Sequence, residues 1–102
     1  MTKPPDVVAQ HVVATPGTVA GKPRIAGRRI TVQQIAIWHE RLGMSPDDIA
    51  SAYDLTLGDV HAALAYYHDH REAIDAAIRA DDALVAELRR QTPSRLRARL
   101  GA

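Results

Sequence analysis

The amino-acid sequence predicts a mainly α-helical protein that begins with a β-hairpin, continues into a three-helix helix-turn-helix domain and ends in a helical arm. Three observations predict this order: short valine runs beside turn residues near the N-terminus, three N-cap signals in the middle of the chain, and an alanine-rich C-terminal stretch. The divisions are residues 1–30 for the hairpin and a basic loop, residues 31–70 for the helix-turn-helix core, and residues 71–102 for the arm.

The composition is that of one small globular domain. The chain has 102 residues and a mass of 11.1 kDa, with 46% hydrophobic and 25% charged residues. The absence of cysteine excludes disulfides, thiolate metal sites and cysteine nucleophiles. No apolar run reaches the roughly 20 residues of a membrane helix, and MTKPPDVVAQ lacks the features of a signal peptide. We therefore expect a cytoplasmic protein without a membrane partner.

The net charge of +1 conceals three segments of different sign. Residues 1–44 carry six basic and two acidic residues, residues 45–88 carry two basic and ten acidic residues, and residues 89–102 carry five arginines and no acid. This segregation indicates that the segments face different partners, two of them anionic. Alternatively, the basic and acidic surfaces complement each other within one chain or between subunits.

Two valine pairs, at positions 7–8 and 12–13, precede a turn at Pro16 and Gly17. A second extended stretch is expected at residues 18–20, and a short strand or loop near residues 24–30. Strands this short are unstable alone, so they should pack on helices or pair with a second copy of the chain.

Three N-cap signals define the starts of the core helices. Thr31 precedes Gln34 at the spacing of a capping box, and Gly43 stands where a left-handed residue would end that first helix. The second helix starts with Ser45, Pro46 and two aspartates, and the third with Thr56 three residues before Asp59. Apolar positions at helical spacing supply an aliphatic core, namely Val32, Ile35, Ile49, Val60, Leu64 and Tyr67.

Two further aromatic side chains belong either to this core or to a subunit interface. Trp38 continues the apolar face of the first helix, whereas Tyr66 points away from the stripe that includes Tyr67. We expect a homodimer whose interface includes Val8, Val12, Trp38 and Tyr66.

A fourth helix is expected to start near Asp69 and Glu72, to run to about Arg90 and to end at Pro93. Asp81 interrupts its apolar stripe, so the helix should lie either on its own domain or in a partner's groove. Beyond Pro93, arginine alternates with apolar residues, and this end is compatible with an extended or a helical conformation. The residues expected to bind a partner are Ile74, Ile78, Val85, Leu88, Arg95, Arg97 and Arg99.

The loop before the first helix carries four cations, Lys22, Arg24, Arg28 and Arg29, between small residues that allow a close backbone approach. Such a segment is typical of contacts to DNA phosphates, although a solvated basic hairpin would have the same composition. The third helix, residues 56–68, has no Arg, Lys, Asn or Gln, so we expect DNA binding to depend on the loop.

No catalytic or metal-binding pattern stands out in the sequence. The five histidines form neither an HxxxH nor an HExxH spacing, and the carboxylates near residues 47–59 are explained as helix N-terminal acids. We therefore expect no enzyme activity, no catalytic residues, no cofactor and no metal site.

The segments GKPRIAGRRITV and GMSPDDIASAYDLTLGDVHAALAYYHDHREAID resemble the bacterial domain of unknown function 433 (DUF433) family. The resemblance spans about residues 16–78, with its parts in the expected order. The chain departs from the family pattern at Arg28, where Thr is usual, and at Gly58, where Glu is usual.

The resemblance implies a homeodomain-like or winged-helix-like fold after a β-hairpin. It also implies an antitoxin of a type II toxin–antitoxin pair that neutralises a PIN-like ribonuclease toxin and binds operator DNA for autoregulation. The arginine-rich end would then pair with the carboxylates that hold the metal of the ribonuclease. The alternatives are a stand-alone DNA-binding transcriptional regulator and a protein–protein adaptor.

Overall fold

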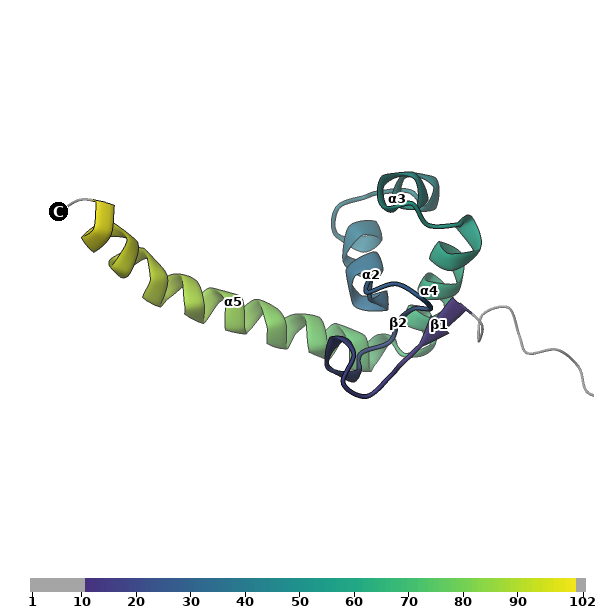
Figure 1. The fold of residues 1–102 in the computed structure, drawn as a ribbon, viewed down its shortest axis with the longest axis horizontal. Coiled ribbons are helices and arrows are strands. Elements are labelled where there is room, and N and C mark those ends of the chain that lie inside the picture. Colours follow the sequence, from purple (N-terminus) through teal and green to yellow (C-terminus); the bar gives the residue numbers. More distant parts are fainter. Residues whose placement is uncertain (1–10, 101–102) are drawn as a thin grey trace, which may run out of the picture. The chain divides into compact units, whose positions relative to one another are not determined.

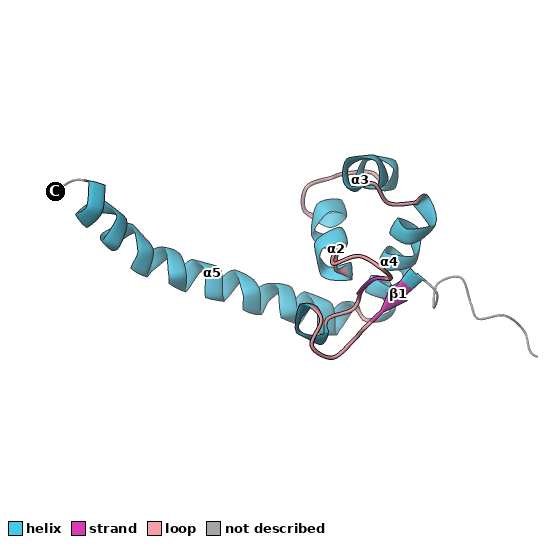
Figure 2. Ribbon diagram, viewed as in Figure 1, coloured by secondary structure: helices cyan, strands magenta, loops and turns pink. Residues whose placement is uncertain are grey.

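The structure, a computed structural model, describes the backbone of residues 11–100 and the side chains of residues 11–91. The described chain is mainly helical, with a small antiparallel hairpin at its start (Figures 1 and 2). It divides into two compact units, one ending at Arg71 and one beginning at Glu72. The elements are β1 (Val12–Val13), the 3-10 turn η1 (Val19–Gly21), β2 (Arg24–Ile25), α2 (Val32–Glu40), α3 (Pro46–Tyr53), α4 (Leu57–Asp69) and α5 (Arg71–Leu100).

The three helices of the first unit begin where their N-cap signals predict. Thr31, Ser45 and Thr56 each accept a hydrogen bond from the backbone N–H three residues later, at 3.0, 3.1 and 3.0 Å. In each case the side chain at that third position bonds back to the N-cap backbone, so all three are complete capping boxes. Gly43 adopts a φ of +69° after α2, which confirms the predicted left-handed residue.

The core of this unit lies where α4 packs against both α2 and α3. Its members are aliphatic, as the composition predicts, and Tyr67 is buried with them. The side chains with less than 2% exposure are Ile25, Val32, Ile35, Ile49 and Val60. Ile25 comes from β2, so the hairpin contributes to the same core, which meets the expectation that short strands need helices to pack on.

The hairpin differs from the sequence prediction in its connection. β1 pairs with β2 in antiparallel register, with Val12 opposite Ile25, whereas the expected second extended stretch at residues 18–20 is wrong. Val19 and Ala20 have φ values of 48° and 57°, and they form a left-handed turn closed by a bond from Gly21 N to Thr18 O. Turn closure here overrides the β preference of valine. The pair at positions 7–8 lies outside the described residues.

Replacing Ala20 with glycine should stabilise the protein. The alanine is exposed, so no packing is lost, and glycine removes the steric cost of a left-handed φ. Because glycine also gains entropy in the unfolded chain, the net increase in unfolding free energy should be up to about 1 kcal/mol. Urea unfolding measures it, with Ala14→Gly as the control: Ala14 is exposed and has no positive φ, so its replacement should destabilise. A less stable Ala20→Gly protein would contradict the left-handed turn.

The second unit is the helix α5, whose 30 residues span about 45 Å. It begins at Arg71, which confirms the start expected near Asp69 and Glu72; α4 continues through Asp69, and only His70 separates the two helices. The predicted end at Pro93 is wrong, since the helix continues to Leu100. A proline removes one helical hydrogen bond, but Ala, Leu and Arg on both sides favour helix and continue it. The sequence left the segment after Pro93 open to an extended or a helical conformation, and its backbone is helical in the structure.

The apolar residues of α5 fall into two groups. Ile74 and Ile78 are buried, whereas Leu84, Val85 and Leu88 are exposed. None of the helices among the described residues combines the length and the apolar character that crossing a membrane requires.

Candidate functional site

Arg24, one of the four cations predicted to contact DNA, is engaged in bonds within the first unit. Arg24 donates to the carbonyls of Ile25 at 3.3 Å and Arg28 at 3.0 Å, and to the hydroxyl of Thr15 at 3.2 Å. These bonds join both ends of the hairpin connection to the loop before α2. Arg24 therefore fixes the conformation of the loop from which the other cations project.

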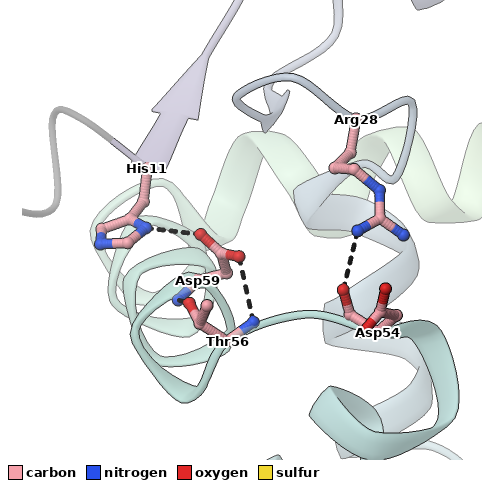
Figure 3. Close-up of polar contacts among 5 residues, drawn as sticks. All are labelled: His11, Arg28, Asp54, Thr56 and Asp59. Atoms are coloured by element: carbon pink, nitrogen blue, oxygen red, sulfur yellow. Dashed lines mark hydrogen bonds and ion pairs between the residues drawn. The ribbon is translucent and has the colours of Figure 1, made fainter.

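Arg28 connects this loop to the turn between α3 and α4. Its guanidinium donates to the carbonyl of Tyr53 at 2.7 Å. It also donates to the carbonyl of Asp54 at 2.8 Å (Figure 3). These carbonyls belong to the end of α3, where a helix has unpaired acceptors and a partial negative charge. Asp54 itself has a left-handed φ of 54°, which turns the chain toward α4. Arg28 thus caps α3 and holds the loop against the α3–α4 turn.

The remaining two cations lie beside these anchors. Lys22 is half-buried, and Arg29 has an exposed side chain. The structure therefore keeps all four residues in the segment between η1 and α2, with Arg24 in β2. It separates them by role: Arg24 and Arg28 bind backbone carbonyls, and Arg29 presents its charge to solvent.

His11, Thr56 and Asp59 form a second cluster. Its capping pair, Thr56 and Asp59, was predicted from the sequence, but the contact of His11 with Asp59 was not. His11 Nδ1 lies 2.5 Å from Asp59 Oδ1, and Thr56 N donates to Asp59 Oδ2 at 3.1 Å (Figure 3). His11 precedes β1, and Asp59 stands in the first turn of α4. The pair therefore fastens the hairpin to the start of α4.

Gly58 makes room for this contact. A Cβ at position 58 would lie 3.3 Å from both Cε1 and Nε2 of the His11 ring, closer than an ordinary contact. The glycine costs helix stability in a first turn, yet it allows the ring to reach Asp59. The departure from the family pattern at Gly58 was the one available signal, and nothing in the local sequence connects it with His11.

The carboxyl of Asp59 is held in its charged form by these neighbours. Burial acts to raise its pKa, but the hydrogen bonds from His11 and Thr56 and the charge of His11 together outweigh burial and lower the pKa of Asp59. The first turn of α4 therefore carries a stable carboxylate instead of a cation. That DNA binding does not depend on this helix end stays a prediction.

The lowered pKa of Asp59 predicts a loss of stability in acid. The folded pKa of Asp59 lies below the ordinary value of 3.8. The contribution of its carboxylate to the unfolding free energy is therefore complete above pH 3.8 and disappears as the pH falls through the folded pKa. Asp59→Asn should therefore destabilise the protein at neutral pH, and the difference in unfolding free energy from the unaltered chain should close as the pH falls below 3.8 through the folded pKa. Urea unfolding between pH 2 and 7 measures this difference. A stability difference that does not change with pH would contradict the lowered pKa of Asp59. In a His11→Ala background, which lacks the hydrogen bond from His11, the stability lost on Asp59→Asn should be smaller.

The aromatic residues form two stacked pairs. Trp38 stacks on Tyr53 with ring centroids 3.8 Å apart and planes 3° apart, and Tyr66 stacks on His70 at 4.0 Å. Trp38 and Tyr66 are both half-buried, so each combines packing with an exposed part. Val12 is half-buried in β1. A subunit interface at these three residues stays a prediction, and Val8 lies outside the described residues.

The residues predicted to bind a partner are divided along α5. Ile74 and Ile78 are buried, which leaves them little surface for a partner, whereas Val85 and Leu88 are exposed, together with Leu84. Arg95, Arg97 and Arg99 belong to the helical backbone, and their side chains lie outside the described residues. Among the residues that the structure describes, no group of three or more side chains is arranged to hold a metal ion.

Comparisons with known proteins agree with the resemblance found in the sequence. Residues 12–67 match the model of a protein family of unknown function, DUF433. The chain is also similar to the crystal structure of a DUF433 member from Anabaena variabilis, with 31% identity, a TM-score of 0.64 and 69% of each chain covered. No curated protein matches the chain. The chain thus belongs to the DUF433 family.

Proposed function

We propose that this protein is an antitoxin that binds a PIN-like ribonuclease through α5 and blocks its active site. The observation that carries the proposal is the group of exposed apolar side chains on α5, a helix in the second compact unit: Leu84, Val85 and Leu88. Exposed apolar groups on an amphipathic helix are typical of segments that dock in a partner's groove.

The arginine-rich end of α5 supports an inhibitory role. Residues 89–102 contain five arginines and no acid, so the segment suits an anionic surface. As the family resemblance implies, a PIN-like active site holds clustered carboxylates around Mg²⁺ or Mn²⁺. Guanidinium groups form two parallel hydrogen bonds with a carboxylate and would compete with the metal for those ligands.

Co-expression with a PIN-like ribonuclease encoded beside this gene tests the proposal. We expect the two proteins to co-purify and the chain to rescue growth that the ribonuclease arrests. Co-purification without rescue would favour a protein–protein adaptor. If the ribonuclease is folded and the two proteins neither co-purify nor show growth rescue, the antitoxin proposal is contradicted.

We propose further that the first unit binds operator DNA as a helix-turn-helix module. The support is local: α3 and α4 are joined by three residues, and the basic loop carries the exposed cation Arg29. Sequence-independent contacts from Lys22 and Arg29 to phosphates would position the module on the duplex.

Replacing Lys22 and Arg29 together with alanine should weaken DNA binding equally on all sequences. Each lost phosphate contact reduces the salt dependence, so the slope of log K against log salt should fall by up to about two phosphate equivalents. A filter-binding salt titration measures it, with Arg79→Ala on α5 as the control that removes an exposed cation elsewhere. An unchanged slope would remove the loop from the DNA interface.

A further inference from the structure

The exposed apolar group of α5 occupies the middle of the helix. Leu84, Val85 and Leu88 are 59%, 44% and 51% exposed. A helix that runs from Arg71 to Leu100 has its midpoint between residues 85 and 86, so these three side chains lie at its centre. We name them the central patch. Leu84 and Leu88 are four residues apart and Val85 lies between them, three residues before Leu88, so the three side chains share one face of the helix.

The charges of α5 are divided at the same midpoint. Residues 71–85 carry four acidic and two basic residues, whereas residues 86–100 carry one acidic and five basic residues. The acid in the second half, Glu87, is itself bonded to Arg90 and Gln91. The helix therefore has an acidic half and a basic half on either side of an apolar centre.

We propose that the central patch binds the central patch of a second copy of this chain, with the two helices antiparallel. A two-fold axis through the helix midpoint brings the two patches together, as a self-complementary interface requires. The same axis places the acidic half of each helix beside the basic half of the other copy. It also makes the two helix dipoles antiparallel, which is the favourable arrangement.

The same charges disfavour a parallel arrangement. Parallel helices would set acidic half beside acidic half and basic half beside basic half, which is repulsive along the whole length. This pairing differs from the interface expected at the hairpin and at Trp38 and Tyr66. It does not rest on the proposed function, since it needs no ribonuclease. A ribonuclease that binds the central patch would have to displace the second copy.

Sedimentation equilibrium of the full chain tests the central patch. The unaltered chain should dimerise, and Leu84→Glu with Leu88→Glu should weaken the dimer at least about tenfold. Both leucines are exposed, so circular dichroism should show unchanged helix content. The control is Leu42→Glu, which places the same charge at a leucine that is 65% exposed in the first unit and should leave the dimer unchanged. A monomeric unaltered chain, or a dimer that survives the double change, overturns the proposal.

A charge exchange tests the orientation. One variant replaces Arg89 and Arg90 with glutamate, and the other replaces Asp81 and Asp82 with arginine. In an antiparallel pair each variant alone sets like charges together, so each should be mainly monomeric, and an equal mixture should restore the dimer. In a parallel pair, Arg89 and Arg90 already face the same arginines of the other copy. Changing them to glutamate would replace one repulsion with another, so the dimer would not be weakened. An undiminished dimer of either variant alone, or failure of the mixture to dimerise, therefore contradicts the antiparallel pairing.

Discussion

A chain that ends at Arg79 should remain folded but lose inhibition of the ribonuclease. It keeps Ile74 and Ile78, the last two buried side chains among residues 11–91, so its thermal unfolding should stay cooperative. It lacks Leu84, Val85 and Leu88 and the arginine-rich end. We expect that at least about a hundredfold more of the shortened chain is needed for half inhibition of RNA cleavage, because the apolar anchors carry most of such a binding energy.

The same assay separates anchoring from active-site competition. A full-length variant with Arg95, Arg97 and Arg99 replaced by alanine keeps the apolar anchors, so it should still bind the ribonuclease while inhibiting it less. Each charged hydrogen bond lost from the complex would cost about 1.5–3 kcal/mol. Full inhibition by the shortened chain would contradict the role of α5. Full inhibition by the arginine variant would contradict only the competition for carboxylates.

Replacing Arg28 with alanine should destabilise the first unit by about 1.5–3 kcal/mol, because two charge-assisted hydrogen bonds to the end of α3 are lost. For a domain of this size the melting temperature should fall by roughly 6 °C or more. Differential scanning calorimetry measures this fall.

Two variants serve as controls for this result. Arg28→Lys keeps the charge but lacks the planar fork that reaches both carbonyls, so it should recover only part of the stability. Arg29→Ala removes the exposed neighbouring cation and should change the unfolding free energy by less than about 0.5 kcal/mol. If the Arg28→Ala and Arg29→Ala variants had the same melting temperature, Arg28 would not be the cap of α3.

The features that the sequence predicts correctly are local ones. Thr31, Ser45 and Thr56 cap their helices through residues only three positions away, so a short window of sequence contains both partners. The core positions follow from helical spacing on the same elements.

The features that were missed depend on distant partners. His11 and Asp59 are 48 residues apart, and no local pattern indicates that a histidine before β1 reaches the first turn of α4. Arg28 was interpreted by its charge, whereas its partners are backbone carbonyls 25 and 26 residues away. Pro93 was interpreted by its own propensity, which the surrounding helix formers outweigh.

The most direct test of the proposed function is RNA cleavage by the purified ribonuclease, titrated with the full chain. We predict that cleavage falls to background as the chain is added, and that the fall depends on the apolar centre of α5. Cleavage that continues undiminished in a large molar excess of folded chain would contradict the antitoxin function.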